Sequence, residues 1–303
     1  MQLNLHLTRI FFTVVEQGGF SRAAEVLFIS QSATSKAVRE LENQLGLALV
    51  ERGGARSQGL RLTDAGHALH EHARGIFALE RAAVEELSAR AGVRQGRLLI
   101  GASTTIISYW LPPYIALFSR QHPDMQVQIA VGNTQQIAQD LAEFRLDLAL
   151  VEGEVSDERL KAEHWRDESL VLVAAPHLLP ETAKIGYRVL NQQQWLVREA
   201  GSGTREATQR LLLAHGVVPG ETIEIGSNEG IARAVAHGLG IAMLPRVVVQ
   251  DLLELGRLKQ LDFNVEWNRP LYILERASRA LSPAAQVFKS LLATQMEPSW
   301  RLR

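Results

Sequence analysis

The sequence has no cysteine among its 303 residues, which excludes disulfide bonds, thiolate metal sites and cysteine-based redox switches. It also has no apolar run near the roughly 18 residues of a membrane span, and its N-terminus lacks the pattern of a secretory signal. We therefore expect a cytoplasmic protein that makes no membrane contact. The formal net charge of −1 shows no excess of either sign, so any surface for nucleic acid must be a local basic patch.

The remaining composition is that of an ordinary globular protein. Apolar residues make up 46% of the chain and charged residues 21%. The length of 303 residues predicts two or three domains, each large enough to bury its own apolar core.

Residues 18–46, GGFSRAAEVLFISQSATSKAVRELENQLG, contain two short helical patterns separated by a break. We predict Ser21 as the N-cap of the first helix and Ser30 as the N-cap of the second. In the second helix, apolar residues recur with the three- and four-residue spacing of one buried face: Ala37, Val38, Leu41 and Leu45. This layout is typical of a helix-turn-helix, and a helical hairpin with a solvated polar face is the alternative.

The opposite face of the second helix offers amide, hydroxyl and cationic groups, which hydrogen-bond base edges and phosphates when a helix end enters the major groove. A glycine-rich basic stretch at residues 53–59 predicts the tight turn of a wing, with a flexible surface loop as the alternative. The predicted DNA-binding residues are Arg22, Ser30, Gln31, Ser32, Ser35, Lys36, Arg39, Arg52 and Arg56.

Several segments of the chain resemble the N-terminal domain of LysR-type transcriptional regulators. They are FFTVVE at residues 11–16, GFSRAA at 19–24, SQSATS at 30–35, LENQLG at 41–46, LVER at 49–52 and LTDAG at 62–66. One departure is Phe28-Ile29, where members of the family often carry a more polar turn. The resemblance implies a transcription regulator that binds double-stranded promoter DNA as a homodimer or as a homotetramer built from two dimers. RNA polymerase is a further candidate partner.

Residues 63–91 contain no proline and have apolar residues at seven-residue intervals, which predicts a long helix with an imperfect heptad seam. The seam positions are Leu62, Leu69, Ile76 and Ala83, with Ala65 and Leu79 near the alternate positions. We interpret this helix as a dimerisation element, because a helix docked only on its own domain would not need this length. The stretch also holds His67, His70 and His72, but it has no His-Glu-x-x-His pattern, so we predict no metal site.

The second half of the chain alternates strand and helix patterns, which predicts parallel strands in an α/β fold. One set of strands is expected at residues 98–100, 126–131 and 146–151, and a second at 169–174, 194–197, 222–225 and 241–244, with helices at 111–120, 135–144, 204–215 and 230–237. The family resemblance implies that the two sets form a bilobed effector-binding domain similar to periplasmic binding proteins, with the chain returning to the first lobe through residues 272–274.

The expected domains are therefore a winged helix-turn-helix at residues 1–62, a linker helix at 63–91 and an effector-binding domain at 92–303. Within the last, lobe I comprises about residues 96–164 and 267–303, and lobe II about residues 165–266.

Three loops of this half carry groups that suit a ligand, and one of them, at residues 132–134, closes the strand opposite. Ser103 and Thr104 follow a predicted strand, at the carboxyl end where α/β sheets usually bind ligands. The loop at residues 198–205 exposes backbone amides beside a helix N-terminus, which favours a small anion, with Arg198 or Arg205 as candidate charge partners. Ordinary turn and capping chemistry is the alternative.

The family resemblance places all three loops along the effector cleft. The predicted effector-binding residues are Ser103, Thr104, Asn133, Thr134, Arg198, Gly201, Ser202, Gly203 and Thr204. The loop at residues 198–205 also looks like its counterpart in regulators of carbon-fixation and sulfur-assimilation operons, so a small anionic metabolite is the first hypothesis for the effector. We predict no cofactor.

Two other classes of protein remain as alternatives. An α/β enzyme with an accessory helical domain would need a nucleophile elbow, paired carboxylates or a metal cluster, and the sequence shows no such motif. A solute-binding protein would fit the two predicted lobes, but not the predicted DNA-binding head.

Overall fold

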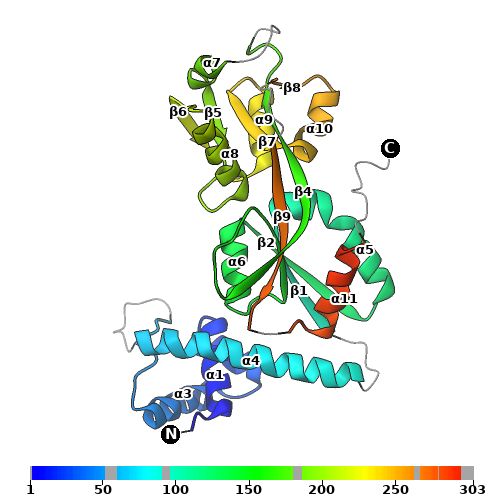
Figure 1. Ribbon diagram of the computed structural model, residues 1–303. Coiled ribbons are helices and arrows are strands. Elements are labelled where there is room, and N and C mark those ends of the chain that lie inside the picture. The colour runs from blue at the N-terminus through cyan, green and yellow to red at the C-terminus, as the bar shows by residue number, and fades with distance from the viewer. Residues whose placement is uncertain are drawn as a thin grey trace. The chain divides into compact units, whose positions relative to one another are not determined.

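The computed structural model describes residues 2–51, 60–90, 96–179, 186–262, 267–278 and 280–294. The chain divides into two compact units, residues 1–87 and residues 88–303 (Figure 1). In the described ranges, no helix combines the length and the apolar character that crossing a membrane requires.

The N-terminal unit contains the predicted helix-turn-helix, formed by α1 (Leu5–Glu16), α2 (Phe20–Leu27) and α3 (Gln31–Leu45). Ser30 is the N-cap of α3, as predicted, because its hydroxyl accepts a hydrogen bond of 3.2 Å from the Ala33 amide. The prediction that Ser21 caps α2 is wrong. The helix begins at Phe20, before Ser21. The extended residue Gly19 takes the N-cap position and makes no side-chain hydrogen bond.

The apolar faces of these helices meet in one core. Phe11, Val14 and Leu41 are fully or almost fully buried there. The predicted stripe of α3 contributes Ala37 and Val38 to the same core, while Leu45 packs at its edge. Because the apolar face of α3 is used for packing, its polar face remains toward solvent.

The long helix α4 (Asp64–Arg90) follows a short antiparallel contact between Val50 and Leu62, the residues that flank the predicted wing. The wing itself, residues 52–59, lies outside the described residues. Part of the predicted seam packs within its own chain, since Ala65 and Leu69 lie against the helix-turn-helix core. Farther along α4, Leu79 is 60% exposed and Leu87 is 66% exposed. The helix therefore docks on its own domain at one end and exposes apolar side chains toward the other.

One of the three histidines of this helix contacts α1. His70 is half-buried on α4 and forms a hydrogen bond of 2.8 Å with the Glu16 carboxylate of α1, while its ring stacks on Phe12. This contact lowers the pKa of Glu16, mainly through the hydrogen bond from His70. His67 and His72 are exposed. His70 thus joins α4 to α1.

The C-terminal unit is built on a nine-stranded sheet with the strand order β2-β1-β3-β9-β4-β7-β5-β6, in which β8 pairs with β4. Lobe I contains β1 (Gly96–Ser103), β2 (Met125–Gly132) and β3 (Leu148–Glu152), together with a π-helical turn at Ile106–Trp110, α5 (Pro112–Gln121), α6 (Thr134–Ala142) and α11 (Pro283–Leu292). Strand β1 pairs in parallel with both β2 and β3, as the alternating pattern predicts.

Lobe II contains β5 (Gln194–Val197), β6 (Glu221–Glu224), β7 (Ile241–Pro245) and β8 (Lys259–Gln260), with α7 (Tyr187–Asn191), α8 (Gly203–Ala214), α9 (Asn228–Ala236) and α10 (Arg246–Glu254). Two long antiparallel strands, β4 (Leu160–Ala174) and β9 (Trp267–Arg276), lie side by side and join the lobes (Figure 1). The sequence predicts only short parts of both strands, residues 169–174 and 272–274. Strand β4 therefore begins well before its predicted run, and β9 extends past its predicted run at both ends.

Candidate functional site

The predicted DNA-binding residues that the structure describes are all exposed or half-buried on the helix-turn-helix. Gln31, Ser32, Lys36 and Arg39 are exposed on α3 and Ser35 is half-buried between them. Their spacing places them on one face of the helix. Arg22 and Ser30 are exposed on α2 and at the start of α3. Arg52 and Arg56 lie outside the described residues.

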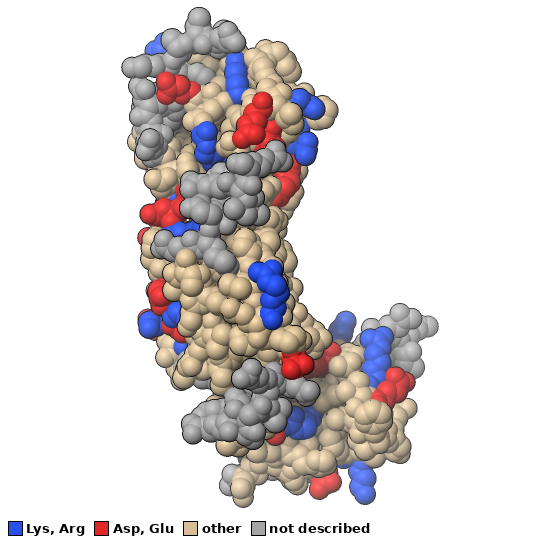
Figure 2. All heavy atoms as spheres, turned by 90° about the vertical axis from the view of Figure 1, so that its right-hand side faces the viewer, with Lys and Arg blue, Asp and Glu red and all other residues tan. Residues whose placement is uncertain are grey.

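Acidic and basic side chains are interspersed on the face of the molecule shown in Figure 2, without a large region of one sign. This mixture agrees with the net charge of −1. A DNA-binding surface would therefore depend on local cations such as Lys36 and Arg39 rather than on a broad basic field.

A buried glutamate fixes the segment that leads into the predicted wing. Glu42 is 8% exposed on α3, and its Oε1 accepts hydrogen bonds of 2.9 Å from the Leu49 amide and 3.2 Å from the Val50 amide. The sequence analysis does not identify Glu42. Its carboxylate ties the segment before the predicted wing to the helix that carries the polar face.

In the C-terminal unit, two predicted effector-binding residues of lobe I converge on the end of β3. Ser103 donates a hydrogen bond of 3.0 Å to Glu152 Oε1, and Thr134 donates one of 3.0 Å to the Glu152 carbonyl. All three residues are buried. Thr104 is half-buried beside Ser103. Glu152, which the sequence analysis does not identify, is therefore the point where the loops of lobe I meet.

The predicted loop of lobe II reaches the same point through two glycines. Gly201 has a φ of +82°, which a residue with a side chain rarely adopts. Gly203 begins α8 directly against β3, where an added Cβ would lie 2.3 Å from the carbonyl oxygen of Glu152. Only glycine allows this approach. The N-terminus of α8 and the end of β3 are thus in contact, and we call this contact the junction.

Thr204 and Arg269 connect this junction to the strands between the lobes. Arg269, on β9, donates hydrogen bonds of 2.8 Å to Thr204 Oγ1 and 3.0 Å to Glu152 Oε2, and Asn228, at the start of α9, donates one of 3.2 Å to Thr204 Oγ1. Asn228 also donates one of 2.9 Å to Thr105 Oγ1 in lobe I. A continuous buried network thus runs from one lobe to the other.

A second buried carboxylate completes this network. Glu168, on β4, accepts hydrogen bonds of 2.8 Å from Arg269 Nε and 2.7 Å from Trp110 Nε1. Burial raises the pKa of Glu168, and the charge of Arg269 opposes this rise. Burial also acts to lower the pKa of Arg269, but Glu152 and Glu168 outweigh it and raise that pKa. Arg269 is therefore held between two carboxylates, away from water.

The remaining predicted residues of the loops close the gap between the lobes. Asn133 donates hydrogen bonds of 3.4 Å to Glu199 Oε1 and 3.3 Å to the Ala200 carbonyl, and the Gln135 amide donates one of 3.1 Å to the Gly201 carbonyl. Arg198 is buried, and its Nε and Nη2 donate hydrogen bonds of 2.7 Å and 2.8 Å to the Glu199 carboxylate. Partial burial acts to raise the pKa of Glu199. The net effect is a lowered pKa, mainly because Arg198 donates a hydrogen bond to the carboxylate.

Ser202 differs from its neighbours. It is the N-cap residue of α8, it is 2% exposed, and its hydroxyl has no hydrogen-bond partner among the described residues. An unpaired buried hydroxyl costs free energy. Ser202 stands at the N-terminus of α8, and the first backbone amides of a helix have no partner within the helix and attract an anion. The junction therefore retains hydrogen-bond donors even though its arginines are ion-paired.

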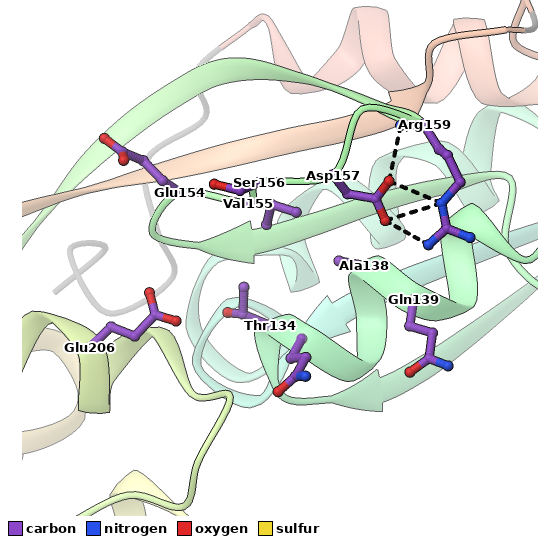
Figure 3. Close-up of a pocket in the computed structure, with 10 residues that line it drawn as sticks. Thr134, Ala138, Gln139, Glu154, Val155, Ser156, Asp157, Arg159 and Glu206 are labelled. Carbon is purple, nitrogen blue, oxygen red and sulfur yellow. Dashed lines mark hydrogen bonds and ion pairs between the residues drawn. The ribbon is translucent and has the colours of Figure 1, made fainter.

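A cavity of about 330 Å³ lies next to this junction, between α6, the loop after β3 and α8 (Figure 3). Glu206 of α8 and Glu154 line it on one side, and Arg159 pairs with Asp157 on the other (Figure 3). Thr134 and Gln135 line it as well, so the cavity adjoins the loops that the sequence analysis predicts as the effector site.

Comparison with known proteins decides the family. Residues 5–67 match the bacterial regulatory helix-turn-helix protein family, lysR type, and residues 91–297 match the LysR substrate binding domain. The chain is a LysR-type transcriptional regulator. It belongs to a family of DNA-binding regulators rather than enzymes, which removes the enzyme alternative.

Three known proteins resemble this regulator over most of their own lengths. The uncharacterized HTH-type transcriptional regulator YeiE of Escherichia coli K12 is 34% identical over 95% of this chain and 96% of its own. The RuBisCO operon transcriptional regulator of Allochromatium vinosum is 32% identical over 97% of both chains. The regulatory domain of Synechocystis CcmR, solved in complex with 2-PG, is 30% identical with a TM-score of 0.60 and covers 66% of this chain and 97% of that domain.

Proposed function

We propose that this LysR-type regulator senses a small anionic metabolite bound where its two lobes meet. In this proposal residues 1–62 read promoter DNA, residues 63–91 join two copies, and residues 92–303 bind the effector. The observation that carries the effector site is Ser202, a buried hydroxyl without a partner at the N-terminus of α8. A helix N-terminus with an unpaired donor favours an anion.

The ion pairs of the junction limit how the anion is held. Arg198 is bonded to Glu199, and Arg205 is bonded to Glu224. Arg269 is bonded to Glu152 and Glu168. We therefore assign recognition to hydroxyls and backbone amides, chiefly Ser202, Thr104 and the glycines of the loop, with the arginines orienting the loop. The similarity to CcmR, which was solved with 2-PG, makes 2-PG a rational probe.

Ser202→Ala is expected to weaken effector binding about ten- to a hundredfold, the usual cost of losing one hydrogen bond to a charged ligand. Because this hydroxyl has no partner among the residues that the structure describes, the variant should keep its stability. The measurement is a thermal-shift screen of 2-PG, small carboxylates, sulfur oxyanions and sugar phosphates, in which bound ligand raises the melting temperature.

Ser108→Ala, at an exposed serine of the π-helical turn, is the matched control. Thr204→Ala is a poorer test, because Thr204 also bonds Arg269 and Asn228. If an anion stabilises wild type and Ser202→Ala equally, or if only uncharged compounds bind, the anion site at α8 is wrong.

Lys36→Ala is expected to weaken binding to the promoter fragment upstream of the chain's own gene and to flatten the dependence of log K on log salt by about one unit, because one phosphate contact is lost. Gln31→Ala should instead relax sequence preference. Fluorescence anisotropy at several salt concentrations measures both effects. Unchanged affinity and salt slope in both variants would mean that α3 does not enter the major groove.

Leu79→Asp is expected to dissociate the dimer, because a charge would replace an apolar side chain in the seam between two copies of α4. The side chain of Leu79 is largely exposed in the single chain, so the substitution leaves the monomer folded. Sedimentation of wild type and variant measures the change. An unaltered oligomer would place the dimer interface elsewhere.

The mechanism that we infer is a population shift. An anion that binds one arrangement of the lobes better than another changes the proportion of the two arrangements. In a tetramer built from two DNA-bound dimers, that change alters the spacing and the bend of the DNA between them.

A further inference from the structure

Phe28 is the most exposed large apolar side chain of the helix-turn-helix that the structure describes, with 95% of its surface open to solvent. It follows the last residue of α2, and its φ of 55° and ψ of 38° place it in the left-handed helical region. The amides of Phe28 and Ile29 close the helix by bonding the carbonyls of Glu25 and Ala24, at 3.3 Å and 3.1 Å. This is the bond pattern of a glycine-type helix C-cap.

Nothing in the folding of the turn requires phenylalanine at this position. A residue with a Cβ in the left-handed region is disfavoured, and glycine or asparagine would fill the same turn at lower cost. The exposed ring gains no burial in the free protein. Ile29, by contrast, is only 38% exposed. Phe28 therefore costs stability in the free chain and calls for a partner outside it.

The position of Phe28 indicates what that partner is. The residue lies two positions before Ser30, the N-cap of α3, and three before Gln31, the first residue of the helix. Phe28 is therefore close in sequence to Gln31, Ser32 and Lys36, which are also exposed. When the N-terminus of a recognition helix enters the major groove, the turn before it comes to the rim of the groove. The one apolar group that base pairs present there is the C5-methyl of thymine, which phenylalanine contacts in protein–DNA complexes.

We infer that Phe28 packs its ring against a thymine C5-methyl group at the edge of each half-site. This contact gives the regulator a preference for thymine, in addition to the sequence preference that the hydrogen bonds of α3 provide. The inference rests on the proposed placement of α3 in the major groove. It assigns to this chain a specificity-determining residue on the turn rather than on the helix.

The test uses the full-length protein and two duplexes of the promoter fragment, one normal and one with every thymine replaced by uracil, which removes only the methyl groups. Wild type and Phe28→Asn are titrated against both by fluorescence anisotropy. Phe28→Asn is expected to bind normal DNA more weakly and to lose less affinity on the uracil duplex than wild type does. The expected coupling is about fourfold for each methyl contact, the value of one buried methyl group.

Val26→Asn is the matched control, because it removes a 51%-exposed apolar side chain two residues away, and it should show no coupling to the methyl groups. Phe28→Asn should melt at or above the temperature of wild type, since asparagine tolerates the left-handed region. Three results would each overturn the inference. Phe28→Asn could bind normal DNA as tightly as wild type does, or the losses in affinity from Phe28→Asn and from the uracil duplex could simply add. In the third, Val26→Asn shows the same coupling to the methyl groups as Phe28→Asn. If Lys36→Ala also keeps its affinity and salt slope, the placement of α3 has failed instead. If Phe28→Asn loses transcription but binds both duplexes like wild type, the ring contacts a protein and the inference is wrong.

Discussion

Replacing Arg269 by methionine is expected to lower the free energy of unfolding of the C-terminal unit by about 3–5 kcal/mol, the usual cost of removing one partner of a buried ion pair. Methionine has a similar length and fills the space, so the loss comes from charge. Glu152 and Glu168 are 2% and 1% exposed, and Arg269 is their shared cation. Without it, the two buried carboxylates lose the cation that balances their charges, although Ser103 and Trp110 still donate to them.

The pH dependence of this loss has a definite sign. The charge of Arg269 opposes the raised pKa of Glu168, so the pKa of that carboxyl should rise further in the variant. A carboxyl whose pKa is higher in the folded state stabilises the fold at low pH and loses this contribution as the pH rises through the folded-state value. The deficit of Arg269→Met should therefore be smaller near about pH 5 than near about pH 8.

Urea unfolding followed by tryptophan fluorescence measures this deficit, since Trp110 donates directly to Glu168. The control is the triple variant Glu152→Gln, Glu168→Gln, Arg269→Met, which carries no buried charge at this site and should recover most of the loss. If Arg269→Met has the same free energy of unfolding as wild type at both pH values, water reaches the buried network.

Replacing Gly203 by valine is expected to separate α8 from β3, to cost about 3 kcal/mol of stability, and to abolish the effector response. An added Cβ would meet the Glu152 carbonyl oxygen at 2.3 Å and the Glu152 Cβ at 2.8 Å, and backbone in a sheet cannot yield by that much. The N-terminus of α8 would have to move, and with it Ser202 and Thr204. Both stability and the thermal shift with anions report this change.

Gly226→Val is the matched control for this substitution. Gly226 lies in a neighbouring loop of lobe II, and an added Cβ there would have nothing within 4 Å. That variant should keep its stability and its effector response. Should Gly203→Val respond to an anion as wild type does, the junction of α8 and β3 has no part in sensing.

The sequence predicts the elements that carry their own periodic signal. The stripe of Ala37, Val38 and Leu41 identifies α3, and the apolar runs of lobe I identify β1 and β3 with their parallel pairing. The first half of β4 carries no such signal. Most of residues 160–168 are polar and exposed, and they are extended because β9 pairs with them. A strand that is fixed by a partner about a hundred residues away cannot be read from its own composition.

The same physical limit applies to the site. The loops that hold Ser103, Thr134 and Thr204 are predictable, because strands of an α/β unit end at one edge of the sheet. The groups that they meet were not predicted. Glu152 has a signal, since it is a charge at the end of a fully buried strand. Arg269 has none, because the two carboxylates it bonds lie 101 and 117 residues away in the chain.

We propose that an anion bound between the lobes changes how this regulator holds DNA. The most direct measurement is a DNase I footprint of the full-length protein on its own upstream fragment, at saturating protein, with and without an anion that stabilises wild type but not Ser202→Ala. We predict that occupancy stays complete while the protected length and the hypersensitive positions between the two half-sites change, and that Ser202→Ala shows no change. Identical footprints with and without the anion would contradict the account.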